Sequence, residues 1–340
     1  MHIMMKNLFP FLLLTLSLAA CRLAAVAQPT ETAQAASPTF VLGAETVASG
    51  NYELTLSGED MEPRDVIVHI PPAYDGSLKL PLLIVLHGGG GSAKQIQQYT
   101  EMDSAADEYG FVVVYPNGSG RLGDSVLTWN AGHCCEYART HQVDDVAFLS
   151  LLIERMLSHY SLDPQRVYIT GISNGGMLAY RAGAELAHKV AAIAPIAATI
   201  GGRVSQGEFE LVPGTPDAPV SVIAFHGLLD QHVLYAGGEA PEALDAGRVD
   251  LSVEASIAFW LNANGCNLQP ETETLAAGNI VIDTYGGCEA GTEVVLVTIV
   301  DGGHAWPGAR QRLVGDDPTQ DISANEMMLQ FFLEHRKFSE

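Results

Sequence analysis

The sequence predicts an α/β fold in which a mostly parallel central sheet carries helices on both faces. Continuous apolar runs alternate along the chain with longer segments of helical character, which is the pattern of parallel strands joined by helices. The later runs are apolar throughout, as expected for strands that are buried on both faces. The 340-residue chain is 47% hydrophobic, which is enough for one large core, and residues 41–340 are expected to form a single domain.

The predicted strands follow one another in a regular order. The first two segments alternate polar and apolar residues and end at Pro71-Pro72, so they are expected to be edge strands. The remaining runs are expected to lie inside the sheet. In chain order, the predicted strands are residues 51–57, 65–70, 81–86, 111–115, 166–170, 190–200, 220–225 and 294–300.

Helices are expected between and after these strands. Residues 92–109 are polar and compatible with a helix. Asp144 and Asp145 begin a second helix, since acidic side chains favour a helix N-terminus. The apolar residues of that helix share one face: Val146, Leu149, Ile153, Met156 and Leu157. Ser323 and Glu326 have the spacing of a capping box and predict the start of a last helix.

Residues 1–20 have the character of a secretion signal. Lys6 supplies a positive charge, and the apolar run that follows is too short to span a membrane stably. Leu18-Ala19-Ala20-Cys21 resembles a bacterial lipobox, in which Cys21 would become the lipidated first residue. Cleavage after Ala25-Val26-Ala27 is the alternative and would release a free protein. Residues 21–40 are expected to be a flexible tether, and the protein is expected to be extracellular or at the cell surface.

The formal net charge of −23 argues against nucleic acid and anionic lipid as partners, because phosphate binding requires clustered Lys and Arg. Association with a membrane is therefore expected only through an N-terminal lipid anchor. The oligomeric state is left open.

Four cysteines remain besides Cys21, which suits an oxidising compartment. Cys266 and Cys288 flank a polar loop and are expected to pair, which would stabilise the fold by about 3 kcal/mol. Cys134 and Cys135 are adjacent, and the sequence leaves open whether they form a vicinal disulfide or stay as thiols. Two neighbouring cysteines cannot both reach one tetrahedral metal comfortably, so no metal is expected there.

Gly171-Ile172-Ser173-Asn174-Gly175 is the most informative segment. It has the G-x-S-x-G pattern of a nucleophile elbow, and it lies between an apolar strand and a helical segment as that motif requires. So tight a turn needs residues with almost no side chain beside the serine. The helix that follows points its N-terminal N–H groups at the place where an oxyanion would form. Ser173 is therefore the candidate nucleophile.

A serine hydroxyl needs a base to take its proton, and the base needs a carboxylate to fix its tautomer. In folds with this elbow the order along the chain is Ser, acid, His. His304 lies on a Gly-Gly turn directly after the final core strand and is the candidate base. His188 is on the helix leaving the elbow, and His335 is in a charged C-terminal turn. His226 precedes the acid candidate, and His232 is too close to it.

Asp230 is the candidate acid, because it follows the strand at residues 220–225 by a short turn. Asp283 and Glu289 are its rivals, but both lie in the segment that the predicted disulfide encloses. The oxyanion donors are expected to be the N–H group of Asn174 and those of the turn at Gly88 and Gly89.

Three further side chains lie near the same sheet edge. His87 is expected to hold the glycine loop through hydrogen bonds. Trp129 and Trp306 lie in loops, where each is expected to be either a wall of an aromatic or acyl pocket or a packed loop aromatic.

This ordered set of motifs resembles the secreted polyhydroxybutyrate depolymerase and feruloyl esterase family. The similarity covers about residues 50–335. Its motifs are His87-Gly-Gly-Gly, Trp129 with Cys134-Cys135, Val143-Asp-Asp-Val146, Gly171-Ile-Ser-Asn-Gly-Gly176, His226-Gly-x-x-Asp230, Cys266 with Cys288, and Gly303-His-Ala-Trp-Pro-Gly308. The resemblance implies an α/β-hydrolase fold, hydrolysis of carboxylic esters without a cofactor, and Ser173, Asp230 and His304 as catalytic triad. It also implies a disulfide between Cys266 and Cys288.

The chain departs from the family pattern at Leu228-Leu229 and Leu234, where small polar residues and a proline are expected. This loop borders the predicted site, so the difference bears on substrate preference. The expected function is an extracellular serine esterase acting on feruloyl or other hydroxycinnamoyl esters of plant polysaccharide, because no polymer-binding module is visible. Hydrolysis of short-chain polyhydroxyalkanoate is the second expectation. A peptidase is a further alternative, which is disfavoured because the chain has no room for the second domain that such enzymes usually carry. A non-catalytic surface-binding lipoprotein is another, which is disfavoured because the predicted triad is intact.

Overall fold

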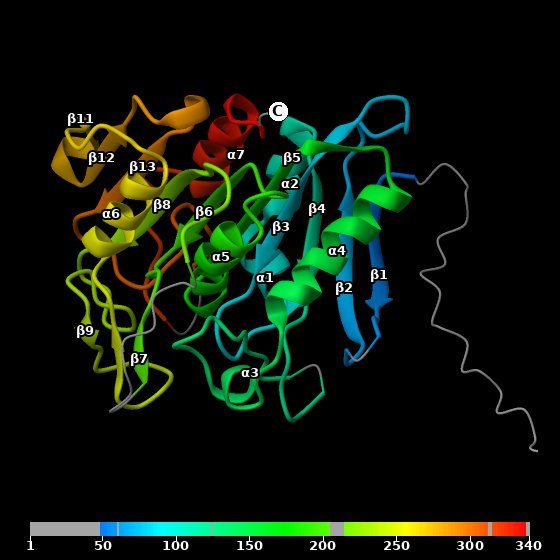
Figure 1. Ribbon diagram of the computed structural model, residues 1–340, viewed down its shortest axis with the longest axis horizontal. Coiled ribbons are helices and arrows are strands. Elements are labelled where there is room, and N and C mark those ends of the chain that lie inside the picture. The colour runs from blue at the N-terminus through cyan, green and yellow to red at the C-terminus, as the bar shows by residue number, and fades with distance from the viewer. Residues whose placement is uncertain (1–47, 60, 124, 205–213, 312–314, 338–340) are drawn as a thin grey trace, which may run out of the picture. The chain divides into compact units, whose positions relative to one another are not determined.

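A ten-stranded mixed sheet runs through the described part of the chain (Figure 1). The computed structural model describes residues 48–59, 61–123, 125–204, 214–311 and 315–337. The strand order is β1-β2-β4-β3-β5-β6-β8-β13-β12-β11. The bounds are β1 Gly50–Leu56, β2 Arg64–Ile70, β3 Leu80–Leu86, β4 Val112–Pro116, β5 Leu162–Ile172, β6 Ala192–Ile196, β8 Ser221–Gly227, β11 Glu271–Leu275, β12 Ile280–Tyr285 and β13 Val294–Ile299.

The strands from β4 to β13 in this order run parallel, and antiparallel strands complete both edges. The predicted mostly parallel sheet is thus confirmed. Because parallel strands end at the same edge, the loops that follow β3, β5, β8 and β13 converge there. These are the loops that contain the candidate site residues.

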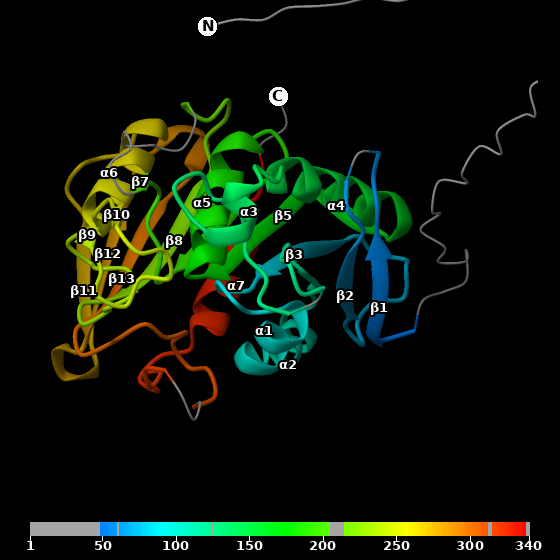
Figure 2. The same cartoon turned by 90° about the horizontal axis from the view of Figure 1, so that it is seen from below.

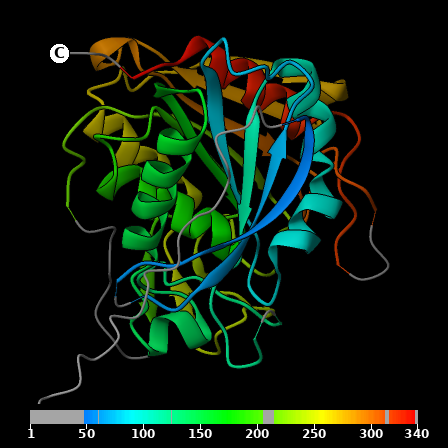
Figure 3. The same cartoon turned by 90° about the vertical axis from the view of Figure 1, so that its right-hand side faces the viewer.

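Helices cover both faces of the sheet (Figures 2 and 3). On one face lie α4 (Asp145–His159), α5 (Asn174–Glu185) and α6 (Val253–Ala263), and on the other lie α1 (Ala93–Thr100), α2 (Met102–Tyr109) and α7 (Ala324–Glu334).

Strand β3 shows why each face has its own core. Leu82, Ile84 and Leu86 pack into the core beneath α4, α5 and α6, whereas Leu83 and Val85 pack into the opposite core. Successive side chains of a strand point to opposite faces, so a strand buried on both sides must be apolar throughout. The continuous apolar runs in the sequence follow from this requirement.

Two of the predicted helices begin at a residue whose side chain caps the first turn. The carboxylate of Asp144 accepts a hydrogen bond from Ala147 N at 2.9 Å at the start of α4. The hydroxyl of Ser323 accepts one from Glu326 N at 3.2 Å at the start of α7. Each cap satisfies an N–H group that has no partner within the helix. Helix α5 differs, because no side chain caps its first turn at Ser173.

Several elements were not predicted from the sequence. Residues 92–109 form two helices rather than one, since Glu101 adopts a left-handed conformation with φ 50° between α1 and α2. The segment enclosed by the predicted disulfide contains an antiparallel hairpin, β11 and β12, of which β11 is largely polar and exposed. Helices α3 (Glu136–Thr140) and α6 and a small sheet were also missed. That sheet has the order β7-β10-β9, with bounds Gly202–Val204, Arg248–Asp250 and Gly238–Glu239.

Cys266 and Cys288 form a disulfide beside this hairpin, as predicted. The predicted signal segment, the tether at residues 21–40 and Cys21 lie outside the described residues. Among the helices in the described part of the chain, none has the length and apolar character needed to cross a bilayer.

Candidate active site

Ser173 lies at the sharp turn where β5 ends and α5 begins. Its backbone has φ 57° and ψ −126°, a combination that costs a non-glycine residue about 1–3 kcal/mol and is typical of functional sites. Glycine is required at positions 171 and 175, because other main-chain atoms lie too close to leave room for a side chain there. A Cβ atom on Gly171 would lie 2.6 Å from the carbonyl carbon of Gly175, and one on Gly175 would collide with main-chain oxygens of Leu86 and His87. The predicted elbow geometry is therefore present.

Asp230 and His304 meet at the same edge of the sheet. Asp230 follows β8, His304 follows β13, and these two strands are parallel neighbours. His304 Nδ1 donates a hydrogen bond to Asp230 Oδ2 at 2.7 Å. Because the carboxylate can only accept, this bond fixes the proton of the neutral imidazole on Nδ1 and leaves Nε2 as the basic nitrogen.

The carboxylate of Asp230 is buried and surrounded by donors. Its Oδ1 accepts from the N–H groups of His232 and Val233 at 2.8 and 2.9 Å. Burial alone would raise the pKa of Asp230, but the imidazoles of His226 and His304 beside Oδ2 outweigh burial and hold this pKa well below its ordinary value. Asp230 is therefore ionised at neutral pH.

The glycine loop after β3 packs directly against the elbow. A Cβ atom on Gly88 would lie 3.5 Å from that of Ser173. His87 holds this loop as predicted: its Nδ1 donates to Gly88 O at 2.8 Å, and its Nε2 accepts from Gly118 N at 3.0 Å. This arrangement requires a neutral ring, and burial lowers the pKa of His87 to about 4.

Asn174, the first residue of α5, is held in place by hydrogen bonds of its side-chain amide. Asn174 Oδ1 accepts from Trp129 N at 2.7 Å, and Asn174 Nδ2 donates to Trp129 O at 2.9 Å. The indole of Trp129 in turn donates to His87 O at 2.9 Å. The elbow and the glycine loop are thereby held together through Trp129.

Of the two alternatives for Trp129 and Trp306, the structure contradicts the pocket walls and confirms the packed loop aromatics. Both rings are fully buried, and neither lines the cavity beside Ser173. Trp306 donates through its indole to Asn325 Oδ1 at 2.9 Å. The sequence indicated that both residues lie in loops near the site, but it could not show that their side chains face inward.

Ser173 and His304 line the same cavity, which has a volume of about 390 Å³. Gly88, Gly89 and Asn174 also line it, so the structure brings the predicted nucleophile, base and oxyanion donors to one place. Asp283 and Glu289 do not line it. The lining residues that were not predicted are Gly91, Gln95, Ile96, Tyr99, Cys135, Ile172, His232, Glu242, Leu244, Arg248, Gly315 and Asp316.

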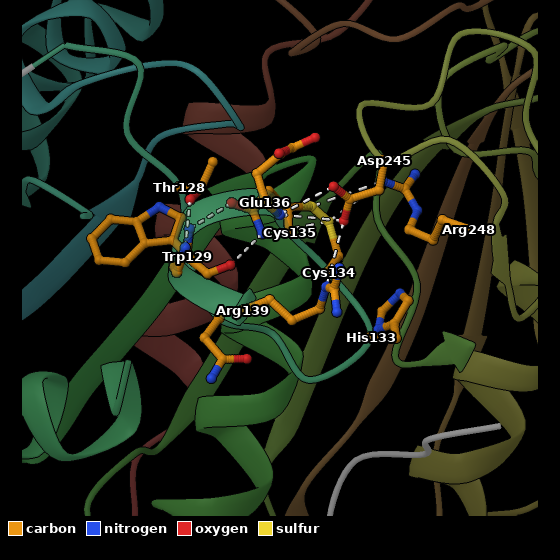
Figure 4. Close-up of a disulfide and its surroundings, with 12 residues drawn as sticks. Thr128, Trp129, His133, Cys134, Cys135, Glu136, Arg139, Asp245 and Arg248 are labelled. Atoms are coloured by element: carbon orange, nitrogen blue, oxygen red, sulfur yellow. Dashed lines mark hydrogen bonds and ion pairs between the residues drawn. A yellow bond between two sulfur atoms is a disulfide. The ribbon is translucent and has the colours of Figure 1, made fainter. Parts of the chain in front are cut away.

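Cys134 and Cys135 form a vicinal disulfide next to this cavity (Figure 4). Arg248 Nη1 lies 3.4 Å from Cys134 Sγ, and the guanidinium also forms a paired interaction with Asp250 at 2.8 and 2.9 Å. Arg248 is a buried cation that the sequence gave no reason to place here, since it lies 113 residues from Cys135 in the chain. The disulfide and Arg248 form one wall of the cavity.

Two groups of possible metal ligands occur among the described residues: Asp230 with His232 and His304, and Cys134 with Cys135 and Asp245. In the first, the imidazole planes are nearly parallel, at 13°, so their nitrogen lone pairs do not converge on one point. In the second, the sulfurs are bonded to each other. Neither arrangement has the tetrahedral geometry of a zinc site.

Comparison with known proteins agrees with this architecture. Residues 66–207 match the family model described as Esterase PHB depolymerase. The chain is 33% identical over 243 residues to feruloyl esterase B of Piromyces equi, covering 71% of this chain and 42% of that protein. It is 27% identical over 246 residues to a bifunctional acetylxylan esterase/xylanase of Neocallimastix patriciarum, covering 71% of this chain and 31% of that protein. The chain thus spans less than half the length of these curated relatives.

The solved structure of an acetyl xylan esterase from Aspergillus awamori shares the fold, with a TM-score of 0.54 at 14% identity, covering 83% of this chain and 98% of that one. The motifs, the fold and the sequence matches agree: residues 66–207 match the PHB depolymerase esterase family, the chain is similar to esterases, and its fold is that of the α/β hydrolases.

Proposed function

We propose that this protein is a serine carboxylesterase in which Ser173, His304 and Asp230 form a catalytic triad. The observation that carries the proposal is the 2.7 Å hydrogen bond between His304 and a buried, ionised Asp230, at a cavity that Ser173 also lines. This is the combination of nucleophile, base and orienting carboxylate that acyl transfer requires.

In the proposed mechanism, Ser173 Oγ attacks the ester carbonyl carbon while His304 Nε2 takes its proton. Asp230 stabilises the imidazolium that forms and keeps the ring in one orientation. His304 then returns the proton to the leaving alcohol, and an acyl-serine remains. Water attacks this intermediate with His304 again acting as base, which releases the carboxylic acid and restores Ser173.

The negative charge on the carbonyl oxygen is proposed to be stabilised by the N–H group of Asn174 and those of Gly88 and Gly89. The first turn of α5 supports this role, because it has no side-chain cap and its N–H groups carry the positive end of the helix dipole. Removal of one oxyanion donor typically lowers kcat by about 10²–10³.

The lining of the cavity favours an ester with an aromatic acyl group and a polar alcohol. Ile96, Tyr99 and Leu244 offer apolar surface, whereas Gln95 and Glu242 offer hydrogen-bonding groups. Together with the similarity to a feruloyl esterase and an acetylxylan esterase, this favours hydroxycinnamoyl esters of plant polysaccharide. The family model of PHB depolymerase esterases supports a second candidate, short-chain polyhydroxyalkanoate.

We also propose that the protein is exported, with Cys21 as the site of lipid attachment. The support is the sequence of residues 1–21 alone. Mass spectrometry of the mature N-terminus tests this point: a diacylglyceryl-modified Cys21 is expected, and an unmodified N-terminus at residue 28 would favour the free secreted form.

The activity is tested by comparing the wild type with Ser173→Ala on three substrates: a p-nitrophenyl acyl ester, a feruloyl-arabinose ester and a peptide anilide. Turnover of both esters by the wild type alone is expected. Equal turnover by the two proteins, or turnover of the anilide alone, would rule the proposal out. Ferulate release compared with hydrolysis of a polyhydroxybutyrate film decides between the two candidate substrates.

A further inference from the structure

The imidazole of His232 lies flat against that of His304. The ring centroids are 4.6 Å apart and the planes differ by 13°. His232 is partly exposed and lines the same cavity as Ser173 and His304. The sequence had excluded His232 as a base because of its closeness to Asp230, and no role was assigned to it.

The position of His232 is fixed by main-chain hydrogen bonds. Its N–H group donates to Asp230 Oδ1 at 2.8 Å, and its carbonyl oxygen accepts from Arg248 Nη2 at 3.0 Å. Arg248 is itself anchored by Asp250. Residue 232 is therefore tied on one side to the proposed acid and on the other to a buried ion pair, and its stacking on His304 follows from this placement.

Stacking has a direct consequence for a catalytic histidine. The hydrogen bond to Asp230 fixes only Nδ1 of His304, so the ring can still tilt about that contact. A second ring packed parallel against its face restricts this tilt, and a base must stay within about 0.5 Å of its productive position.

The charge of His232 also matters, because His304 becomes positively charged during the reaction. Burial, followed by the nearby charge of His304, lowers the pKa of His232. The carboxylates of Asp230, Glu242 and Asp316 also face His232 and act in the opposite direction. A neutral His232 stacks on the imidazolium without repulsion, whereas a protonated His232 would oppose its formation.

We propose that His232 is a positioning residue for the ester hydrolysis proposed above: its neutral imidazole holds the ring of His304 in place, and its protonation switches this support off. The inference rests on the proposed function. Because both anchoring hydrogen bonds use main-chain atoms of residue 232, substitution of its side chain leaves them intact.

The test uses the full chain with His232→Ala, His232→Phe and, as a matched control, His141→Ala. His141 also stacks on an aromatic ring, that of Tyr137 at 4.0 Å, but it does not line the cavity. With p-nitrophenyl acetate, His232→Ala is expected to lower kcat about tenfold with little change in KM, because the base is misaligned while the cavity stays open. His232→Phe is expected to recover most of kcat, since it restores a ring face, and His141→Ala is expected to match the wild type.

The pH profile separates this role from a purely structural one. On the acid side, log(kcat/KM) of the wild type is expected to fall with a slope greater than one, because protonation of His304 stops the reaction and protonation of His232 lowers the rate further, whereas the slope of His232→Phe is expected to be about one. Equal slopes, or a kcat of His232→Ala equal to that of the wild type, would overturn the proposal. If Ser173→Ala is inactive in the same assay, such a result refutes the role of His232 alone; if Ser173→Ala is active, the proposed function itself fails. Thermal unfolding of each variant shows whether it is folded.

Discussion

The side-chain amide of Asn174 and the main chain of Trp129 form a two-way hydrogen-bonded pair, with distances of 2.7 and 2.9 Å across 45 residues of sequence. Asn174 directly follows the proposed nucleophile, and the indole of Trp129 holds the main chain at the start of the glycine loop. The two halves of the proposed oxyanion hole are therefore attached to one tryptophan.

Replacement of Asn174 by Ala is expected to weaken both stability and catalysis. It leaves the buried N–H group of Trp129 without a partner, which costs about 1–3 kcal/mol of unfolding free energy, whereas the carbonyl oxygen of Trp129 keeps its hydrogen bond from Cys135 N at 3.0 Å. It also frees the first residue of α5 to shift, so kcat is expected to fall at least tenfold, as about 1.4 kcal/mol of transition-state stabilisation is lost. Denaturant unfolding and p-nitrophenyl ester kinetics check this. Asn262→Ala, at an exposed position on α6, is the control and is expected to change neither quantity.

Trp129→Phe and Trp306→Phe form a matched pair, because each removes one indole hydrogen bond from a fully buried ring. Both variants are expected to lose about 1–3 kcal/mol of unfolding free energy. Only Trp129→Phe is expected to lower kcat, since its lost partner is His87 O beside the glycine loop. An equal fall of kcat in both variants would show that Trp129 has no specific link to the oxyanion donors.

Asp230→Asn is expected to lower kcat by about 10³–10⁴, because the amide no longer fixes the tautomer of His304. The exposed Asp301→Asn, on the loop after β13, is expected to behave as the wild type. The pKa of Asp230 is depressed in the folded state, so its ionised form contributes stability above the ordinary carboxyl pKa near 4. Unfolding measured from pH 8 to pH 3 is therefore expected to show a constant gap between wild type and Asp230→Asn that narrows only below about pH 4.

The lowered pKa of His87 predicts that the folded protein loses stability at mildly acid pH. Its folded-state pKa is about 4, whereas the unfolded chain titrates near 6.5. Between these values the unfolded state binds a proton that the folded state does not, so unfolding becomes easier as the pH falls. The contribution amounts to about 3 kcal/mol between pH 7 and pH 4. His87→Gln, which can still donate and accept, is expected to flatten the dependence of unfolding free energy on pH. An unchanged dependence would contradict this assignment.

The disulfide between Cys266 and Cys288 is expected to affect stability without affecting catalysis. Neither cysteine lines the cavity beside Ser173. Replacement of both by Ala is expected to lower the unfolding free energy by about 3 kcal/mol, since the bond closes a loop between positions 22 residues apart. The kcat and KM of the folded variant are expected to equal those of the wild type.

The sheet and the triad candidates could be predicted because each leaves a local signal. Continuous apolar runs identify strands buried on both faces, and the parallel topology brings the residues after them to one edge. Ser173, Asp230 and His304 each directly follow such a run or the turn after it, so their positions in sequence were enough to select them.

The remainder of the site depends on contacts that the sequence does not encode locally. Arg248 and Leu244 reach the cavity from a segment without periodic apolar pattern, and their position in its lining follows only from how that segment folds in three dimensions. His232 was excluded because it is near Asp230 in sequence, yet this closeness is what places its ring against His304. The inward orientation of Trp129 depends on a carbonyl oxygen of another loop, which no pattern in the sequence reveals.

The hairpin β11–β12 gives the sheet an outer strand whose five residues, Glu271 to Leu275, are all exposed. A free strand edge offers unpaired main-chain groups to any other extended chain and so invites aggregation. Glu271 and Glu273 place negative charges along this edge, and a second copy of the strand would bring like charges together. The acidic side chains therefore disfavour pairing of β11 with a second copy of the same strand.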